Sequence, residues 1–441
     1  MKFKKRIKSW KKFPNVDTLG FYHCLGNYIQ LNEFEDENEF KKSSSNPSLD
    51  KNRFSVYLHE NQHYIDQIST YWGIKNIYRT FRAFNAALLG TEYDFHYYRD
   101  LILNLQRDYF LDYYTENYNH IVGGFNNLWK FQFKVGIRFD FDGKVNEERP
   151  IPLITFSSSD GQKISRVPLS VVSLLETTAT YIEYKFLLDE VLKLNSPYKE
   201  LQGQSLSKKL EDKLYHPELT LYSVAVHLTS VHLQINDPIL GYKISSIFAK
   251  LALNLPESVF SSVIIPTELK EDKNWTKRSK SLIQNHDRGF IFYLLIRNYK
   301  SKYGELNGHE INVNNILDAS NLPNEEEIES IISEEITKLD VQILSEKNCF
   351  NRQILDKVFF GNKFRKATGL GQQKNTPDLS EFIRDKPYLI FASTDFEYEH
   401  LELKPIVDKV IWQQSLSREE WFRLYTYCES RIDGFNEICG I

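Results

Sequence analysis

The sequence lacks the features that mark disulfide-stabilised, membrane-spanning and nucleic-acid-binding proteins. Its four cysteines include no Cys-x-x-Cys pair, so neither a disulfide framework nor a thiolate zinc site is expected. No run of about 18 apolar residues is present, and no apolar stretch follows the N-terminal lysines as it does in a secretory signal. The formal net charge of -4 argues against a nucleic-acid-binding domain, which is usually basic. We therefore expect a cytoplasmic protein with reduced thiols, no transmembrane segment and no specific nucleic-acid partner.

The chain is long enough for two compact units. It has 441 residues, of which 41% are hydrophobic and 26% charged, and a single core rarely extends over that length. We expect residues 1–310 to form the main domain, with residues 1–50 as an N-terminal extension. Residues 311–441 are expected to form a mixed helical region with an accessory or regulatory role.

Hydrophobic periodicity predicts a helix-dominated α+β fold with one small antiparallel sheet. The expected helices cover residues 54–71, 77–129, 171–194, 218–235, 239–254 and 288–303, with further helices opening at Pro323 and Ser417. Extended structure is expected at 20–32 and 131–168, and loops at 33–51, 256–280 and 361–380. Gly73 is expected to end the first helix as its C-cap, and Ser170 to begin the helix that follows the sheet.

The first expected helix contains the sequence His59-Glu60-Asn61-Gln62-His63. Residues four apart share one helix face, so His59 and His63 would present two imidazoles to the same metal ion. Glu60 flanks that face and could take a proton from a metal-bound water without ligating the metal itself. The motif therefore predicts a Zn2+ site in which Glu60 is the catalytic general base.

This helical His-Glu-x-x-His resembles the signature of the zincin superfamily of zinc metallopeptidases. The resemblance covers about twenty residues, and it implies a third protein ligand. In the metzincin branch a Gly follows the second His by three positions and a third His follows it by six. Here those positions hold Asp66 and Ser69, which excludes that branch.

In the gluzincin branch the third ligand is a Glu on a later helix, with a small residue three positions on and an acid four positions on. Glu176 and Ala179 match this pattern, whereas Thr180 stands where the acid is expected. Glu183, one turn further on the same face, would then orient a ligand His, or would itself be the ligand. Glu176 is the preferred ligand. The alternative is a partly exposed Glu176 paired with a Lys or Arg.

Three further side chains are candidates to donate a hydrogen bond to the oxyanion of the substrate, namely Tyr222, His227 and His232. A His on an apolar face is more often a core residue with its hydrogen bonds satisfied, so none of the three is assigned to the site. Asp66 is expected at the surface, with a supporting role beside His63 as the alternative.

Two other interpretations remain open. Glu60-x-x-His63 also has the spacing used in di-iron carboxylate bundles, and Glu397-x-x-His400 repeats it, but in a segment that alternates like a strand. The chain could also be an inactive zincin-like binding or regulatory protein. Sequence signatures of other enzymes, such as a P-loop or G-x-S-x-G, are absent.

The resemblance implies an intracellular zinc endopeptidase that acts on a protein or peptide substrate. Such an enzyme is expected to be selective or controlled by a regulatory protein partner, because an open protease would damage its own cell. The chain is rich in Lys, Asn, Ile and aromatic residues and has one Met, a composition typical of an AT-rich bacterial genome. Intracellular zincins from such genomes can act as toxins or as anti-phage effectors.

Overall fold

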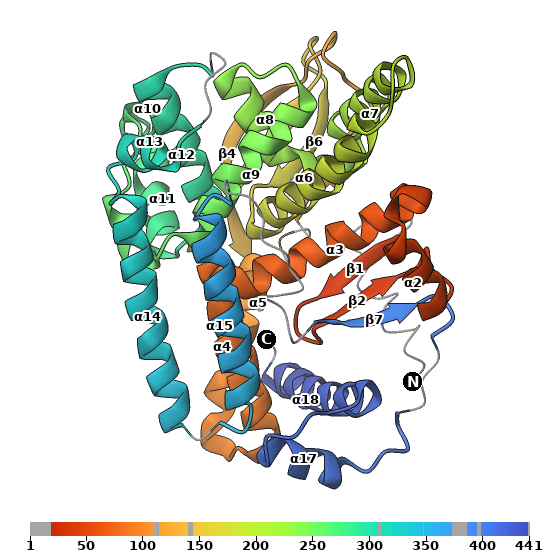
Figure 1. The fold of residues 1–441 in the computed structure, drawn as a ribbon. Coiled ribbons are helices and arrows are strands. Elements are labelled where there is room, and N and C mark those ends of the chain that lie inside the picture. The colour runs from red at the N-terminus through yellow and green to blue at the C-terminus, as the bar shows by residue number, and fades with distance from the viewer. Residues whose placement is uncertain are drawn as a thin grey trace.

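The structure is a computed structural model that describes residues 19–109, 111, 114–139, 144–306, 311–346, 348–372, 386–394 and 398–439. Most of these residues are helical, and two small sheets accompany the helices (Figure 1). The predicted helix-dominated α+β class is therefore confirmed. No helix in the described ranges is long and apolar enough to cross a membrane.

The first half of the chain contains the four-stranded sheet and two strands of the other sheet. Its elements are β1 (Gly20–His23), β2 (Tyr28–Leu31), α2 (Glu37–Ser45), η2 (Pro47–Asp50), α3 (Lys51–Ser69), α4 (Tyr71–Leu89), η3 (Glu92–Asp94), α5 (Phe95–Asp108), β3 (Glu116–Asn117), β4 (Lys130–Phe139), β5 (Val145–Ser157), β6 (Lys163–Pro168), α6 (Val171–Leu192) and α7 (Tyr198–Leu214).

The second half is almost entirely helical. Its elements are η5 (Pro217–Leu219), α8 (Thr220–Leu233), α9 (Pro238–Asn254), η6 (Glu257–Ser262), α10 (Thr267–Glu271), α11 (Lys273–Gln284), α12 (Arg288–Tyr303), α13 (Val313–Ala319), α14 (Glu325–Ser345), α15 (Asn351–Thr368), β7 (Tyr388–Phe391), α17 (Leu403–Ile411) and α18 (Arg418–Cys439).

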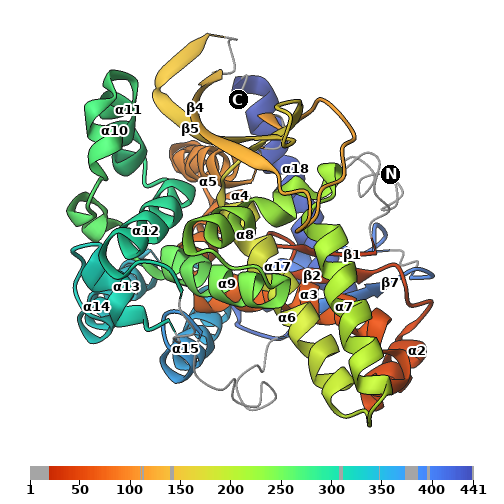
Figure 2. The ribbon, with the colours of Figure 1, turned by 90° about the horizontal axis from the view of Figure 1, so that it is seen from above.

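Helix α6 lies at the centre of the fold. It begins where Ser170 and Ser173 form a reciprocal cap, as the sequence predicted for Ser170. Helices α3, α7, α8 and α9 all pack against it, and buried residues lie on every side of its first three turns. Seen from above, α8 and α9 cover α6 on one side while α3 passes on the other (Figure 2). A helix that is buried all round is typical of such a central position.

The four-stranded sheet is antiparallel, with strand order β3-β6-β5-β4. It confirms the β region expected at 131–168. The second sheet has the order β1-β2-β7, and its strands β2 and β7 are parallel. Tyr388 pairs with Tyr28 across these two strands, so residues from the two ends of the chain lie side by side (Figure 1).

Residues expected in the C-terminal region thus complete a sheet of the N-terminal extension, and α18 packs against α4. The division of the chain near residue 310, and the regulatory role of the second part, stay predictions.

Two segments expected to be loops are helical. The range 33–51 contains α2, whose Asp36 accepts a hydrogen bond from the Glu39 backbone N–H at 2.9 Å. The range 256–280 contains η6, α10 and most of α11. Both segments are rich in polar residues, but each has an aromatic side chain that packs against distant residues: Phe40 lies among Phe34, Tyr57 and Phe391, and Trp275 stacks on Phe133.

Two element boundaries differ from expectation, whereas the expected starts of two later helices are confirmed. Helical structure in the range 77–129 ends with α5 at Asp108, and no helix occurs in the described part of 114–129. Helix α15 continues to Thr368, inside the segment 361–380 that was expected to be a loop. The helix that opens at Pro323 is capped by Asn324 and Glu327, and the last helix by Ser417 and Glu420.

Gly73 does not cap α3 but lies in the first turn of α4. The break between these two helices falls at Thr70, whose hydroxyl accepts a hydrogen bond from the Gly73 N–H at 3.1 Å. A Cβ atom at position 73 would lie 2.2 Å from the carbonyl oxygen of Gln67. Glycine is therefore needed here for close approach of two backbones rather than for a left-handed conformation.

Candidate metal centre

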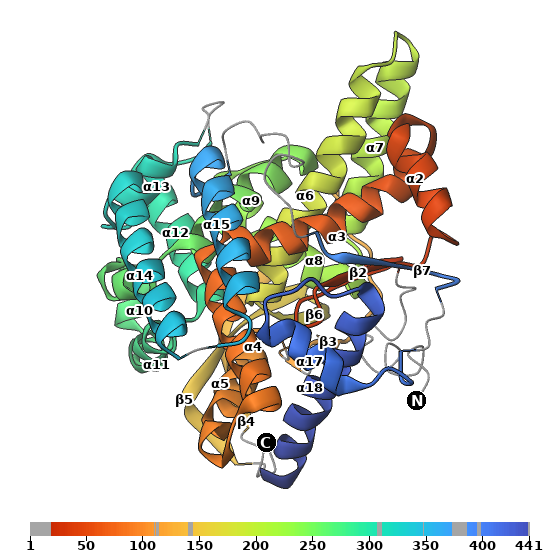
Figure 3. The same cartoon turned by 60° about the horizontal axis from the view of Figure 1, so that its bottom comes forward.

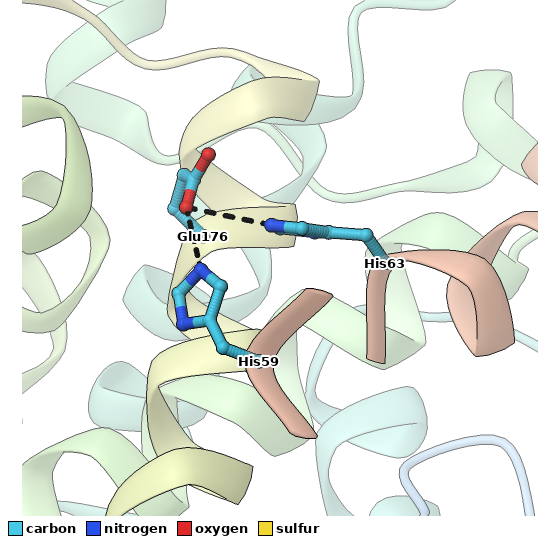
Figure 4. Close-up of side chains that lie close together, drawn as sticks. All are labelled: His59, His63 and Glu176. Carbon is cyan, nitrogen blue, oxygen red and sulfur yellow. Dashed lines mark hydrogen bonds and ion pairs between the residues drawn. The ribbon is translucent and has the colours of Figure 1, made fainter. Parts of the chain in front are cut away.

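Two helices bring the predicted ligands together. His59 and His63 point from one face of α3 toward Glu176 on α6 (Figure 4). One carboxylate oxygen of Glu176 lies 3.2 Å from the Nε2 atom of His59 and 3.6 Å from the Nε2 atom of His63. The three ligand atoms all lie within 4.8 Å of one another.

Two of the three separations between these atoms are close to those of a tetrahedral metal site. Two ligand atoms that are each about 2.1 Å from zinc, at a tetrahedral angle, are separated by about 3.4 Å. The observed separations of 3.2 and 3.6 Å lie on either side of that value. A set of two imidazoles and one carboxylate, with a fourth position left for water or substrate, is also the donor set of catalytic zinc sites.

Glu176 is 3% exposed and is bordered by the two histidines. The alternative in which Glu176 is partly exposed and pairs with a Lys or Arg is therefore wrong. The side chains of His59 and His63 are also largely enclosed, at 9% and 12% exposed. Ligands held this firmly lose little conformational freedom when they bind a metal.

Glu60 is buried beside the ligand face of α3. Strand β1 passes close to it, because a Cβ atom at Gly20 would lie 3.1 Å from the Glu60 Cγ atom. β1 forms one edge of the three-stranded sheet. The glycine thus lets an edge strand approach the predicted general base.

Glu183 lies on the opposite side of the His59 ring from Glu176. Its carboxylate is 3.2 Å from the Nδ1 atom of His59, and 3.3 Å from the ammonium group of Lys213 on α7. A carboxylate accepts hydrogen bonds only, so this contact places a proton on Nδ1 and directs Nε2 toward the centre of the site. Of the two roles considered for Glu183, the geometry matches the one that orients a histidine.

The electrostatics of these side chains favour a cation. Burial by itself lowers the pKa of His59, but hydrogen bonds with Glu176 and Glu183 outweigh burial and raise it to about 10. Burial raises the pKa of Glu183, and the charge of Lys213 together with the bond to His59 lowers it to about 2. Two carboxylates therefore surround one imidazole, an arrangement that stabilises positive charge.

Tyr222 borders the site from α8. Its ring centroid lies 6.3 Å from that of His59. Burial raises the pKa of the Tyr222 phenol well above its ordinary value, and the negative charges of Glu176, Glu60 and Glu183 raise it further. The hydroxyl group thus stays protonated, as a hydrogen-bond donor to an oxyanion must.

The other two oxyanion candidates lie elsewhere. His227 is buried, donates a hydrogen bond from Nε2 to the Leu214 carbonyl at 2.8 Å and stacks on Trp129; burial lowers its pKa to about 4. His232 contacts Phe131 and Tyr293, and burial lowers its pKa to about 4 as well. The expectation that His227 is a satisfied core residue is confirmed.

Asp66 was expected at the surface, and this expectation is wrong. Asp66 is fully buried, forms an ion pair with Lys250 of α9 and accepts a hydrogen bond from Thr178 of α6 at 2.6 Å. It also accepts one from Gln62 at 2.7 Å. The sequence signal that was missed is Lys250 itself, a lone charge inside the apolar run from Ile247 to Leu253. A cation in such a position requires a buried partner.

Helices α3, α6 and α9 are thus joined through one carboxylate, one turn beyond His63. The network fixes α3 against α6 close to the point where the two helices supply the metal ligands.

The second Glu-x-x-His sequence does not contribute to this cluster. Glu397 lies outside the described residues, and His400 is exposed in a turn. No second group of three or more metal-ligating side chains occurs among the residues that the structure describes.

No protein-family model matches the chain, and neither a curated protein nor a solved structure matches it.

Proposed function

We propose that this chain is a zinc-dependent endopeptidase with a zincin-like core of the gluzincin type. The observation that carries the proposal is the convergence of His59 and His63 from α3 with Glu176 from α6. In this proposal the three residues bind Zn2+, and Glu60 is the general base. The protein acts in the cytoplasm on a protein or peptide substrate, in the manner of a bacterial toxin or anti-phage effector under the control of a regulatory partner.

Hydrolysis of a peptide bond at this site requires a zinc ion in addition to the residues of the chain. Zinc, when bound, would lower the pKa of a coordinated water and polarise the scissile carbonyl. Glu60 takes the proton from the attacking water and passes it to the departing amide nitrogen, which balances the hydrolysis. Tyr222 donates a hydrogen bond to the oxygen that becomes negatively charged. Glu183 holds the His59 ring with its Nε2 atom directed toward the centre of the site.

The first experiment measures metal content by mass spectrometry in the purified wild type, Glu60→Gln, His63→Ala and His400→Ala. We expect about one zinc per chain in all but His63→Ala, because only that variant loses a ligand. His400→Ala is the matched control, since it removes the other histidine of a Glu-x-x-His sequence. Two irons per chain that depend on His400 would establish the di-iron alternative instead.

The second experiment tests hydrolysis. Wild-type protein and Glu60→Gln are incubated with a denatured bacterial lysate, and new N-termini are quantified by mass spectrometry. We expect cleavages that Glu60→Gln does not produce although it retains zinc, because only the base is lost. Equal zinc content with no difference in N-termini between the two proteins would favour the inactive zincin-like binding protein.

A further inference from the structure

A cavity lies where α4, α5, β4 and β5 meet the turn between α11 and α12, elements that are neighbours in Figures 2 and 3. Its volume is about 220 Å³, and its lining includes none of the residues of the metal centre. One water molecule needs only about 10–15 Å³ of such space. The cavity is therefore large enough for a ligand of several non-hydrogen atoms.

The lining of this cavity carries an excess of positive charge. Four arginines line it, each from a different element: Arg79 (α4), Arg107 (α5), Arg138 (β4) and Arg149 (β5). Only two carboxylates, Asp100 and Asp287, accompany them in the lining. The lining itself thus contains four cations and two anions. Such an excess in a cavity attracts an anion.

Two of the arginines have carboxylate partners. Arg107 binds Asp108 through Nε at 2.7 Å and Nη2 at 3.0 Å. Arg79 lies 3.3 Å from Asp100, whose side chain is 59% exposed. Asp287 faces Arg138 without forming an ion pair with it, and no described carboxylate pairs with Arg149. With Asp100, Asp108 and Asp287 against four arginines, one positive charge is left without compensation.

Arg138 is enclosed and forms no direct ion pair with a described carboxylate. Its Nη1 and Nη2 atoms donate to the Gln106 and Arg107 carbonyls, both at 3.3 Å, while its Nε is buried with no hydrogen-bond partner. The pairing of β4 with β5 shifts register between Ile137 and Arg138, an irregularity that redirects side chains. Arg149 makes no hydrogen bond or ion pair with any described residue. A buried donor without a hydrogen-bond partner, such as Arg138 Nε, is unfavourable until a ligand accepts a hydrogen bond from it.

We propose that this cavity binds a small phosphorylated anion of about the size of pyrophosphate. Guanidinium groups recognise phosphate through paired N–H donors of fixed geometry. Arginines that converge from four elements suit a tetrahedral phosphate, which accepts hydrogen bonds in several directions, better than a planar carboxylate. The proposal does not depend on the metal centre, because the two sites share no residue.

The test is isothermal titration calorimetry of pyrophosphate into the full-length protein, at constant ionic strength. We expect saturable binding to the wild type and an affinity lower by about tenfold to a hundredfold in Arg149→Gln. Arg149 has no partner to lose, so this substitution leaves the fold intact. The matched control is Lys134→Gln, which removes the same charge from an exposed position on β4.

His63→Ala is titrated in parallel, because pyrophosphate also binds zinc. Undiminished binding to this variant is expected and places the ligand outside the metal centre. Three results would overturn the proposal: no saturable binding to the wild type, an equal loss in Lys134→Gln and Arg149→Gln, or citrate binding as tightly as pyrophosphate. The last result would show a general anion site rather than a phosphate site.

Discussion

The carboxylate of Glu183 lies 3.2 Å from the Nδ1 atom of His59. The Nε2 atom of the same ring lies 3.2 Å from Glu176, so one imidazole is held between two acids of α6 that are seven residues apart. The two contacts match the two roles expected of these acids, namely metal ligand for Glu176 and orientation of a histidine for Glu183. Glu176 faces the second histidine, whereas Glu183 is backed by Lys213.

Because Glu183 orients His59 and does not bind the metal, we predict that Glu183→Gln lowers zinc affinity by about tenfold to a hundredfold. Glutamine can still contact Nδ1, but it no longer supplies the negative charge that makes His59 a stronger ligand. Glu176→Gln should lose much more affinity because it replaces a ligand. Competition with a fluorescent zinc chelator measures both. Glu200→Gln, at an exposed position on α7, is the control, and a larger loss in Glu183→Gln than in Glu176→Gln would reverse the assignment.

We predict that Tyr222→Phe lowers kcat by about a hundredfold to a thousandfold, with little change in KM. The substitution removes one hydroxyl group and keeps the ring beside His59. Zinc content is expected to stay at the wild-type level. Steady-state kinetics on a peptide identified from the cleavage experiment provides the measurement, and a kcat equal to that of the wild type would remove Tyr222 from the mechanism.

We predict that Asp66→Asn lowers the free energy of unfolding by about 3–5 kcal/mol, because Lys250 would then be a buried cation without a counter-charge. Adding Lys250→Met in the same chain should restore most of that loss. Urea unfolding followed by circular dichroism compares the two variants with the wild type. If the double variant is as unstable as Asp66→Asn alone, the ion pair is not the source of the effect.

Removal of metal should lower the thermal unfolding temperature of the wild type but not that of His63→Ala. A ligand that binds only the folded state stabilises it by about 4 kcal/mol at a free concentration of 1,000 times its Kd. Differential scanning calorimetry with and without a chelator measures this difference. Readdition of zinc should reverse it, and an equal decrease in both proteins would point to a chelator effect unrelated to the site.

The anion cavity should bind pyrophosphate more tightly as the pH falls through about 6. Burial raises the pKa of Asp287 to about 6, so this acid is neutral below that pH and negatively charged above it. Asp287 faces Arg138 from β4 and both Arg107 and Asp108 from α5. When it becomes neutral, the positive charge that acts on the ligand increases.

Asp287→Asn should therefore bind pyrophosphate more tightly than the wild type at pH 7.5, and equally at pH 5. Asparagine also caps helices, so it can replace the carboxylate that accepts the Phe290 N–H at the start of α12. Calorimetric titrations measure the affinity of both proteins for pyrophosphate at the two pH values. Protonation of pyrophosphate itself affects both proteins equally, so it does not contribute to the difference between them. An identical pH dependence in the two proteins would exclude Asp287 as the titrating group.

The sequence by itself determined the features that depend on local spacing. The interval between His59 and His63 places both rings on one face of any helix, and the helix starts at Ser170, Pro323 and Ser417 follow from the chemistry of a few adjacent residues. It could not identify α2 and α11 as helices. Their composition is that of a loop, and packing of Phe40 and Trp275 against distant residues favours the helical state.

Only the tertiary structure distinguished the positions of the two glutamates of α6 relative to the histidines. Glu176 and Glu183 share a helix face, so both satisfy the same periodicity, and their difference depends on where α3 crosses α6 and where α7 places Lys213. The same holds for Asp66, whose burial follows from Lys250, 184 residues away, and for Arg138 and Arg149, which meet only because two strands pair. Contacts between residues far apart in the chain arise from packing of whole elements, which no local pattern encodes.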